Sequence, residues 1–307
     1  MINHKDVICF LGDSMTAGGL WNAEIYQTVG ATKDIRCYNC GVSGSTAAAA
    51  SEYMYGMCLN KSPDKVVIMF GINDISRGAL SSNYVGDDGY DVVARAVDRY
   101  AEKMDLVVRS VIDFDAEPIL CIAPPYDEYN ERVEENLHCD YAMAECAEIV
   151  RDIAKKYSCK LVDFRTPMLN MIYDRMPISA DRVHPTPLGY HIMAQIFLKE
   201  IGEISECDFD TPFVFEEWNG ERYEIERVLA RLNFIDFNML YGKHKDLGWG
   251  IIEKTEECKS RYEQAENKES FIPMCCKNYI DNAKNREDIN DKLTRLTIYP
   301  RKWRENK

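Results

Sequence analysis

Five short apolar runs, spaced widely along the first two hundred residues, limit the folds that this chain can adopt. The runs are rich in β-branched residues and nearly continuous in hydrophobicity, which is typical of parallel strands covered on both faces. They are "DVICFL" at 6–11, "IRCYNC" at 35–40, "KVVIMF" at 65–70, "PILCIA" at 118–123 and "KLVDF" at 160–164. Each run is therefore expected to form one strand of a single parallel sheet.

Helical patterns separate and follow these runs. We expect helices at about 46–58, 91–113, 132–157, 167–174 and 187–202. In the longest, "VVARAVDRYAEKMDLVVRSVIDF", apolar residues recur at steps of three and four, as on a helix that faces a core. The alternation predicts a doubly wound α/β/α sandwich with five parallel strands. Because ligands of such folds bind outside the carboxyl ends of the strands, the residues that directly follow each strand are the first candidates for a site.

The pattern changes near residue 203, where the strand signal fades and long helical patterns take over. We therefore expect an α/β domain at 1–202 and a helical C-terminal extension at 203–307. The extension could cover the sheet domain or make the chain a homo-oligomer, and the sequence leaves both roles open.

Charge and cysteine content narrow the classes of partner. The formal net charge of −14 argues against nucleic acids and anionic membranes as partners. No apolar stretch approaches the roughly 20 residues that cross a bilayer, and the N-terminus "MINHKDVICFLG" has no apolar signal region. We expect a cytoplasmic protein whose twelve cysteines are reduced and mostly buried. The pairs Cys37-x-x-Cys40 and Cys275-Cys276 are interpreted in the same way, since neither has a partner pair for zinc.

Polar residues follow several of the predicted strands. Ser14 comes directly after the first strand in "GDS", Gly41 ends the second, and Asn73 follows the third. Beyond the last strand, Asp181 and His184 lie three residues apart on one loop. A serine alone at a strand end is more often a helix cap, but the parallel topology places all of these residues at the same edge of the sheet.

That set of residues has a chemical logic. A serine hydroxyl becomes a nucleophile when a base takes its proton, which is the role expected of His184. Asp181 would hold the imidazole and stabilise its protonated form. The oxyanion of acyl transfer needs preorganised donors, and we expect them to be the N–H of Ser14, the N–H of Gly41 and the amide of Asn73.

These segments resemble the four sequence blocks of the SGNH, or GDSL-type, serine hydrolases. The matching blocks are Gly12-Asp13-Ser14, Gly41 in "NCGVSG", Gly71-x-Asn73-Asp74 and Asp181-x-x-His184-Pro185. The resemblance covers about residues 5–202 and implies a flavodoxin-like sandwich that hydrolyses esters or thioesters through an acyl-serine. It also implies that the reaction needs no metal or organic cofactor.

Several nearby residues have structural interpretations instead. Asp13 is expected to bond backbone donors in its own turn, and Asp74 is expected to form a turn. Ser43 is the nearest rival nucleophile, although a loop or cap role suits it better. His191 lies seven residues after His184 and is expected to pack on the helix behind the loop.

The substrate is less constrained by the sequence. Loops at 75–90 and 123–136 should border the site, and with Trp21 they provide aromatic rings, including Tyr84 and Tyr126, that could stack on sugars or serve as scaffold. Many carboxylates and no long apolar run favour a small polar ester, so the expected activity is that of a carbohydrate O-acetylesterase. A lysophospholipase or acyl-thioesterase is the alternative enzyme, and an inactive scaffold that binds a protein partner through its C-terminal helices is the alternative class.

Overall fold

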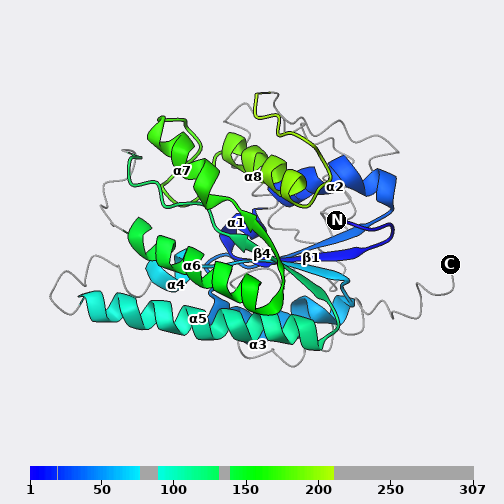
Figure 1. Ribbon diagram of the computed structural model, residues 1–307, viewed down its shortest axis with the longest axis horizontal. Coiled ribbons are helices and arrows are strands. Elements are labelled where there is room, and N and C mark those ends of the chain that lie inside the picture. The colour runs from blue at the N-terminus through cyan, green and yellow to red at the C-terminus, as the bar shows by residue number, and fades with distance from the viewer. Residues whose placement is uncertain (19, 77–88, 131–138, 211–307) are drawn as a thin grey trace, which may run out of the picture.

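Five parallel strands form the central sheet of the computed structural model, which describes residues 1–18, 20–76, 89–130 and 139–210 (Figure 1). The strands are β1 (Val7–Gly12), β2 (Arg36–Gly41), β3 (Lys65–Met69), β4 (Glu117–Ile122) and β5 (Lys160–Asp163). Each lies within one residue of its predicted bounds. The spatial order is β2-β1-β3-β4-β5, so the order reverses beside β1, where a doubly wound sheet forms its ligand crevice.

Helices cover both faces of this sheet, as predicted. Helices α2 and α8 pack together on one face, and α3, α5 and α6 lie on the other (Figure 1). The helical elements are α1 (Ser14–Ala17), α2 (Leu20–Lys33), α3 (Ala47–Met57), the 3-10 turn η1 (Leu59–Lys61), α4 (Ile72–Ser76), α5 (Gly89–Asp113), α6 (Asp140–Tyr157), α7 (Arg165–Tyr173) and α8 (Pro187–Glu200). None of the helices in this described part of the chain is long and apolar enough to span a membrane. The predicted extension lies outside the described residues except for 203–210.

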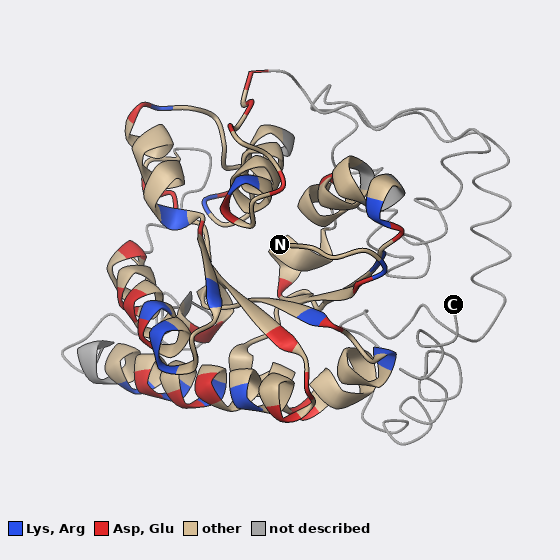
Figure 2. Ribbon diagram, turned by 45° about the vertical axis from the view of Figure 1, so that its right-hand side comes forward, with Lys and Arg blue, Asp and Glu red and all other residues tan. Residues whose placement is uncertain are grey.

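Helices α5 and α2 illustrate why one helix could be predicted from the sequence and another could not. Helix α5 buries Val93, Val97, Tyr100 and Met104 at steps of three and four, and acidic and basic residues alternate along its outer face (Figure 2). Helix α2 was absent from the sequence prediction. It is buried around most of its circumference, polar Asn22 and Glu24 included, so it has no apolar stripe to reveal its period.

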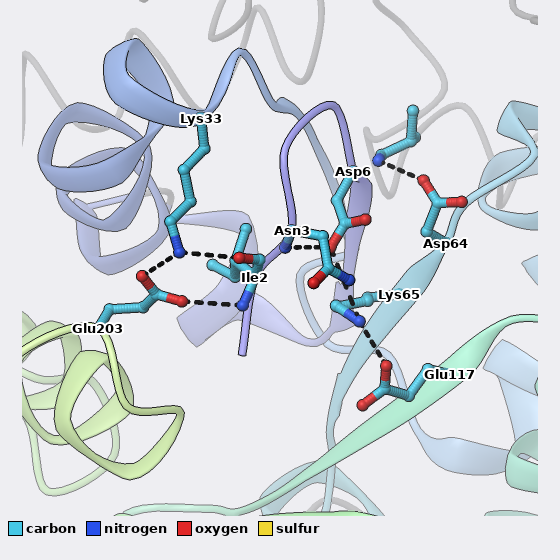
Figure 3. Close-up of polar contacts among 9 residues, drawn as sticks. Ile2, Asn3, Asp6, Lys33, Asp64, Lys65, Glu117 and Glu203 are labelled. Carbon is cyan, nitrogen blue, oxygen red and sulfur yellow. Dashed lines mark hydrogen bonds and ion pairs between the residues drawn. The ribbon is translucent and has the colours of Figure 1, made fainter. Parts of the chain in front are cut away.

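Polar contacts join the N-terminal segment to α2 and to the residues after α8 (Figure 3). The Glu203 carboxylate pairs with Lys33 and accepts the backbone N–H of Ile2 at 2.8 Å. The Lys33 ammonium also donates to the Ile2 carbonyl at 2.8 Å. Nearby, the buried Lys65 at the start of β3 pairs with Glu117 at the start of β4. These contacts all lie at the amino ends of the strands, opposite the edge where the candidate site forms.

A buried ion pair between α2 and α8 fastens the segment that follows α8. His191 Nδ1 lies 2.9 Å from Glu24 Oε1, and its Nε2 lies 2.7 Å from the Asp208 carbonyl oxygen. A carbonyl oxygen can only accept, so Nε2 carries a proton, and the carboxylate favours a proton on Nδ1 as well. Burial alone would lower the pKa of His191, but the hydrogen bond and charge of Glu24 outweigh it and raise that pKa above 6.5. The pair with Glu24 thus favours the imidazolium form of His191 in the folded chain.

We predict that this contribution depends on pH. Because the pKa of His191 is raised in the folded chain, its stabilisation is complete below about pH 6.5 and is lost as the pH rises through the raised value. His191→Gln should lower stability by about 3–5 kcal/mol at pH 6, because it leaves Glu24 without its charged partner. Melting temperatures of parent and variant between pH 6 and 9 should converge with rising pH; a constant difference would contradict the assignment.

Candidate active site

The turn between β1 and α1 places Ser14 at the carboxyl edge of the sheet. Asp13 caps α1 through its carboxylate, which accepts the N–H of Met15 at 3.0 Å. This is the structural role predicted for Asp13. Gly12 allows the turn to be tight, since a Cβ there would lie 2.2 Å from the Thr16 hydroxyl oxygen. Ser14 is thus the first residue of a helix. The N–H groups of the first turn point out of the helix N-terminus, where anions are stabilised.

Three side chains hold this four-residue helix from its other end. Carbonyls at the end of a helix lack partners within the helix. Trp21 Nε1 donates to the Met15 carbonyl at 3.2 Å, and Asn22 Nδ2 donates to the Thr16 carbonyl at 3.4 Å. Asn39 Nδ2, from β2, donates to the Ala17 carbonyl at 3.2 Å. The position of the serine is therefore determined by both neighbouring elements, α2 and β2.

The structure brings Ser14, His184 and Asp181 into one hydrogen-bonded series. His184 Nε2 lies 2.9 Å from Ser14 Oγ, and His184 Nδ1 lies 2.7 Å from Asp181 Oδ2. The second Asp181 oxygen accepts the backbone N–H of His184 at 2.7 Å. Because an ionised carboxylate only accepts, the ring carries its proton on Nδ1, which leaves Nε2 free to accept the serine proton.

The electrostatics of this series favour an ionised Asp181. Burial alone would raise the pKa of the Asp181 carboxyl, but the hydrogen bonds and charge of His184 outweigh that effect and hold the pKa below its ordinary value. The pair remains open to solvent, with 39% of the His184 side chain and 49% of the Asp181 side chain exposed. A water molecule or a bulky alcohol can therefore approach the imidazole directly.

A neighbouring loop fixes the segment that carries Asp181 and His184. Arg182, between them, adopts a left-handed conformation with φ of 72°, which is uncommon outside glycine. Its buried side chain donates from Nε to the Asn130 carbonyl at 2.8 Å, and its own carbonyl accepts the N–H of Asp127 at 2.9 Å. Asn130 in turn donates to the Ser179 carbonyl at 3.0 Å. Sequence reasoning did not identify Arg182, because its role depends on contacts more than 50 residues away in sequence.

Of the predicted oxyanion donors, Gly41 requires a correction. Its N–H donates to Asn39 Oδ1 at 2.9 Å, and its Cα packs so tightly on α1 that a Cβ would lie 2.3 Å from the Ala17 nitrogen. The glycine there permits β2 to approach α1, and its N–H already has an acceptor. Gly44, three residues on, has φ of 78° and lies in the loop beside Asn73, whose Nδ2 donates to the Ser45 carbonyl at 3.1 Å. In the sequence, the second glycine of "GVSGST", Gly44, was the feature that could have drawn attention to this loop position.

Asp74 has more than the turn role expected of it. Its carboxylate accepts the N–H of Ala47, the first residue of α3, at 3.0 Å. Burial and the nearby charge of Asp13 outweigh the hydrogen bond from Ala47 and raise the pKa of Asp74 to about 7. Asp74 thereby joins α4, which carries Asn73, to the start of α3.

The aromatic residues that were predicted to bind substrate differ in where they lie in the structure. Trp21 is fully buried and packs edge-to-face against Phe10, Phe164 and Phe197. It cannot stack on a substrate there, so that prediction is wrong, and its indole N–H instead holds the end of α1. Tyr126 lies on the loop beside the site but is 95% buried, while Tyr84 lies outside the described residues.

An exposed aromatic pair next to the site joins Tyr129, one of the rings expected on the loop at 123–136, to Tyr173, which the sequence did not indicate. Tyr129 and Tyr173 are 47% and 56% exposed, and their rings meet edge-to-face with centroids 5.9 Å apart. The Arg175 guanidinium lies 4.3 Å from the centre of the Tyr129 ring. Tyr129 adjoins Asn130, which contacts the loop of Asp181 and His184. The pair comes from two segments, so only the tertiary structure reveals it.

Comparison with known proteins agrees with this geometry. A model of the GDSL-like lipase/acylhydrolase family matches residues 10–192. An acetylxylan esterase from Geobacillus stearothermophilus is 26% identical over 226 residues, which cover 66% of this chain and 96% of that protein. The crystal structure of that esterase, Axe2, has a TM-score of 0.54 and 25% identity, with 66% of this chain and 96% of that chain covered. Its catalytic mutants with solved structures replace a serine, an aspartate and a histidine.

A second solved structure shows the fold alone. BT4096, a gut microbial diltiazem-metabolizing enzyme, has a TM-score of 0.60 and 22% identity, with 66% of this chain covered. This chain spans 48% of that longer protein. Since the family match spans more than half of the chain and includes Ser14 and His184, the chain belongs to the GDSL-like lipase/acylhydrolase family.

Proposed function

We propose that this protein is a carbohydrate O-acetylesterase that works through an acyl-serine intermediate. The observation that carries the proposal is the hydrogen-bonded series from Ser14 through His184 to Asp181 at the edge of the sheet. The same series argues against an inactive scaffold, because the nucleophile, its base and the carboxylate that orients the base are in contact.

The first half of the reaction follows from that geometry. His184 Nε2 takes the Ser14 hydroxyl proton as Oγ attacks the ester carbonyl, and Asp181 stabilises the resulting imidazolium. The imidazolium then gives its proton to the departing sugar oxygen, which leaves the acyl group on Ser14. In the second half, His184 takes a proton from water, the hydroxide attacks the acyl-serine, and Ser14 recovers its proton when acetate leaves.

The tetrahedral intermediates need donors aimed at their oxyanion. The N–H of Ser14 lies at the start of α1, and Asn73 retains one amide hydrogen beyond the one given to Ser45. We assign the third donor to the N–H of Gly44 in place of Gly41. These donors are neutral, so they stabilise the developing charge without holding the carboxylate product as a cation would.

Support for a carbohydrate ester comes from the relative and from the surface beside the site. The similar protein is described as an acetylxylan esterase. The exposed rings of Tyr129 and Tyr173 provide a flat apolar surface of the kind on which the C–H faces of sugars pack. Self-association through residues 203–307 and a cytoplasmic location stay predictions.

Ser14→Ala should abolish ester hydrolysis, because the remaining groups have no nucleophile to activate. We expect the rate of p-nitrophenyl acetate hydrolysis to fall by about 10⁴-fold or more. Ser43→Ala is the matched control, since Ser43 is a partly exposed loop serine near the same site, and it should keep the parental rate. Equal losses in the two variants would contradict the assignment of the nucleophile.

Acyl-chain length separates the carbohydrate deacetylase from a lysophospholipase or acyl-thioesterase. With p-nitrophenyl esters from acetate to palmitate, kcat/KM should be highest for acetate, because the described rim of the site is aromatic and charged. Acetylated xylo-oligosaccharides, assayed by acetate release, should also be substrates. An increase in kcat/KM with chain length would favour a lipid substrate and remove the deacetylase proposal.

Tyr129→Ala tests the sugar-binding surface itself. It should raise KM for acetylated xylo-oligosaccharides about fivefold, since a lost ring contact is worth about 1 kcal/mol, and leave p-nitrophenyl acetate hydrolysis unchanged. Tyr55→Ala is the matched control, because Tyr55 is also exposed in an edge-to-face pair, with Phe114, but on α3. Unchanged KM values for both substrates in Tyr129→Ala would rule out the ring as a subsite.

A further inference from the structure

Three buried thiols meet where β1, β2 and the end of α3 pack together. The sulfur atoms of Cys9, Cys40 and Cys58 all lie within 4.8 Å of one another, and each residue is at most 1% exposed. Cys9 pairs in register with Tyr38, two residues before Cys40. Side chains two residues apart on a strand share a face, so both thiols face α3, whose C-cap is Cys58.

The spacing of the three sulfur atoms suits a single shared ion. Thiolate sulfur atoms bind zinc at about 2.3 Å, so three of them around one ion lie about 4 Å apart. In the absence of an ion, the thiols make weak contacts with backbone carbonyls at the C-terminal end of α3. Cys40 Sγ lies 3.1 Å from the Met57 carbonyl oxygen, and Cys9 Sγ lies 3.7 Å from the Cys58 carbonyl oxygen.

A buried ammonium sets the charge of this cluster. Lys61, in η1, is only 6% exposed, donates to the Met57 carbonyl and lies 5.6 Å from the centre of the Tyr38 ring. The ammonium therefore lies beside the cluster, since it shares the Met57 carbonyl with Cys40.

We propose that Cys9, Cys40 and Cys58 form a binding site for a divalent, thiophilic metal ion. Sulfur ligands select soft ions over the hard oxygen-seeking ones. When the ion binds, the thiols release their protons to solvent, and three thiolates, one divalent ion and the Lys61 ammonium sum to zero charge. This neutral sum favours a divalent ion over a monovalent one, because a net charge at this depth would be costly.

The site is separate from the catalytic series but mechanically close to it. Cys9 lies on β1, the strand that precedes Ser14, and Cys40 lies beside Gly41, which packs on α1. An ion here would cross-link β1, β2 and α3 behind the nucleophile. Its expected effect is therefore on stability, and the ester hydrolysis itself does not require it.

Cadmium is the probe, because its thiolate complexes absorb in the ultraviolet. The experiment uses the full chain with the cysteines that are only partly buried, or that lie outside the described residues, changed to serine: Cys159, Cys207, Cys258, Cys275 and Cys276. After incubation with Cd²⁺ under reducing conditions until the signal is constant, we expect one bound ion per chain. We also expect a thiolate-to-cadmium absorption band and a melting temperature raised by about 5 °C or more.

The matched variants are Cys40→Ala and Cys37→Ala in the same background. Both thiols are buried on β2, but Cys37 lies on the opposite face from Cys40 because their positions differ by three. Cys37→Ala should keep the ion, the band and the thermal shift, and Cys40→Ala should lose all three. Hydrolysis of p-nitrophenyl acetate reports whether each variant is folded, and Cys58→Ser replaces Cys40→Ala if the latter is inactive.

Two results would overturn the proposal. One is a background protein that hydrolyses p-nitrophenyl acetate but shows neither a bound ion nor the band. The other is equal cadmium binding by the Cys37 and cluster variants. Neither result depends on the identity of the ester substrate, so the metal site and the proposed esterase function fail separately.

Discussion

The hydrogen bonds that end helix α1 are the constraint on which the active site depends. This helix has only four residues, too few to be stable alone, yet it must hold Ser14 within 2.9 Å of the imidazole. Trp21, Asn22 and Asn39 satisfy three consecutive carbonyls at its end, while Asp13 satisfies its start. The capping and catalytic interpretations of the "GDS" turn therefore describe one geometry, since the cap places Ser14 at the N-terminus of α1.

The second half of the site is held by long-range contacts of a different kind. The loop of Asp181 and His184 has little regular structure, and Arg182 anchors it through the Asn130 carbonyl. This arrangement keeps the carboxylate on the imidazole without enclosing either group, so the site stays open to a large alcohol. A surface-exposed pair of this kind suits substrates that are polymers or oligomers better than a closed pocket would. The rings of Tyr129 and Tyr173 extend the same surface away from the serine.

The predictable parts of the site were those that follow from the type of a residue and its position after a particular strand. A serine after a buried strand, an asparagine after another and an aspartate three residues before a histidine are recognisable because parallel strands end at one edge. The choice between Gly41 and Gly44 as an oxyanion donor could not be predicted, because both lie at the end of the same strand or just after it. Only the hydrogen bond from Gly41 to Asn39 shows that the first donor is already used. Trp21 was misassigned for a related reason, since a ring near a nucleophile in sequence can face either the substrate or the core.

The sequence by itself determined the fold class, the strands to within a residue and the choice of Ser14, Asp181 and His184 as the residues that meet at the sheet edge, because hydrophobic period and residue order are local properties. The tertiary structure alone decided the order β2-β1-β3-β4-β5, the burial of α2, the anchoring by Arg182 and the meeting of three thiols from β1, β2 and α3. Each of these depends on which side chains face one another across elements distant in the chain. That relation is set by packing and backbone register, which no local pattern of residue types records.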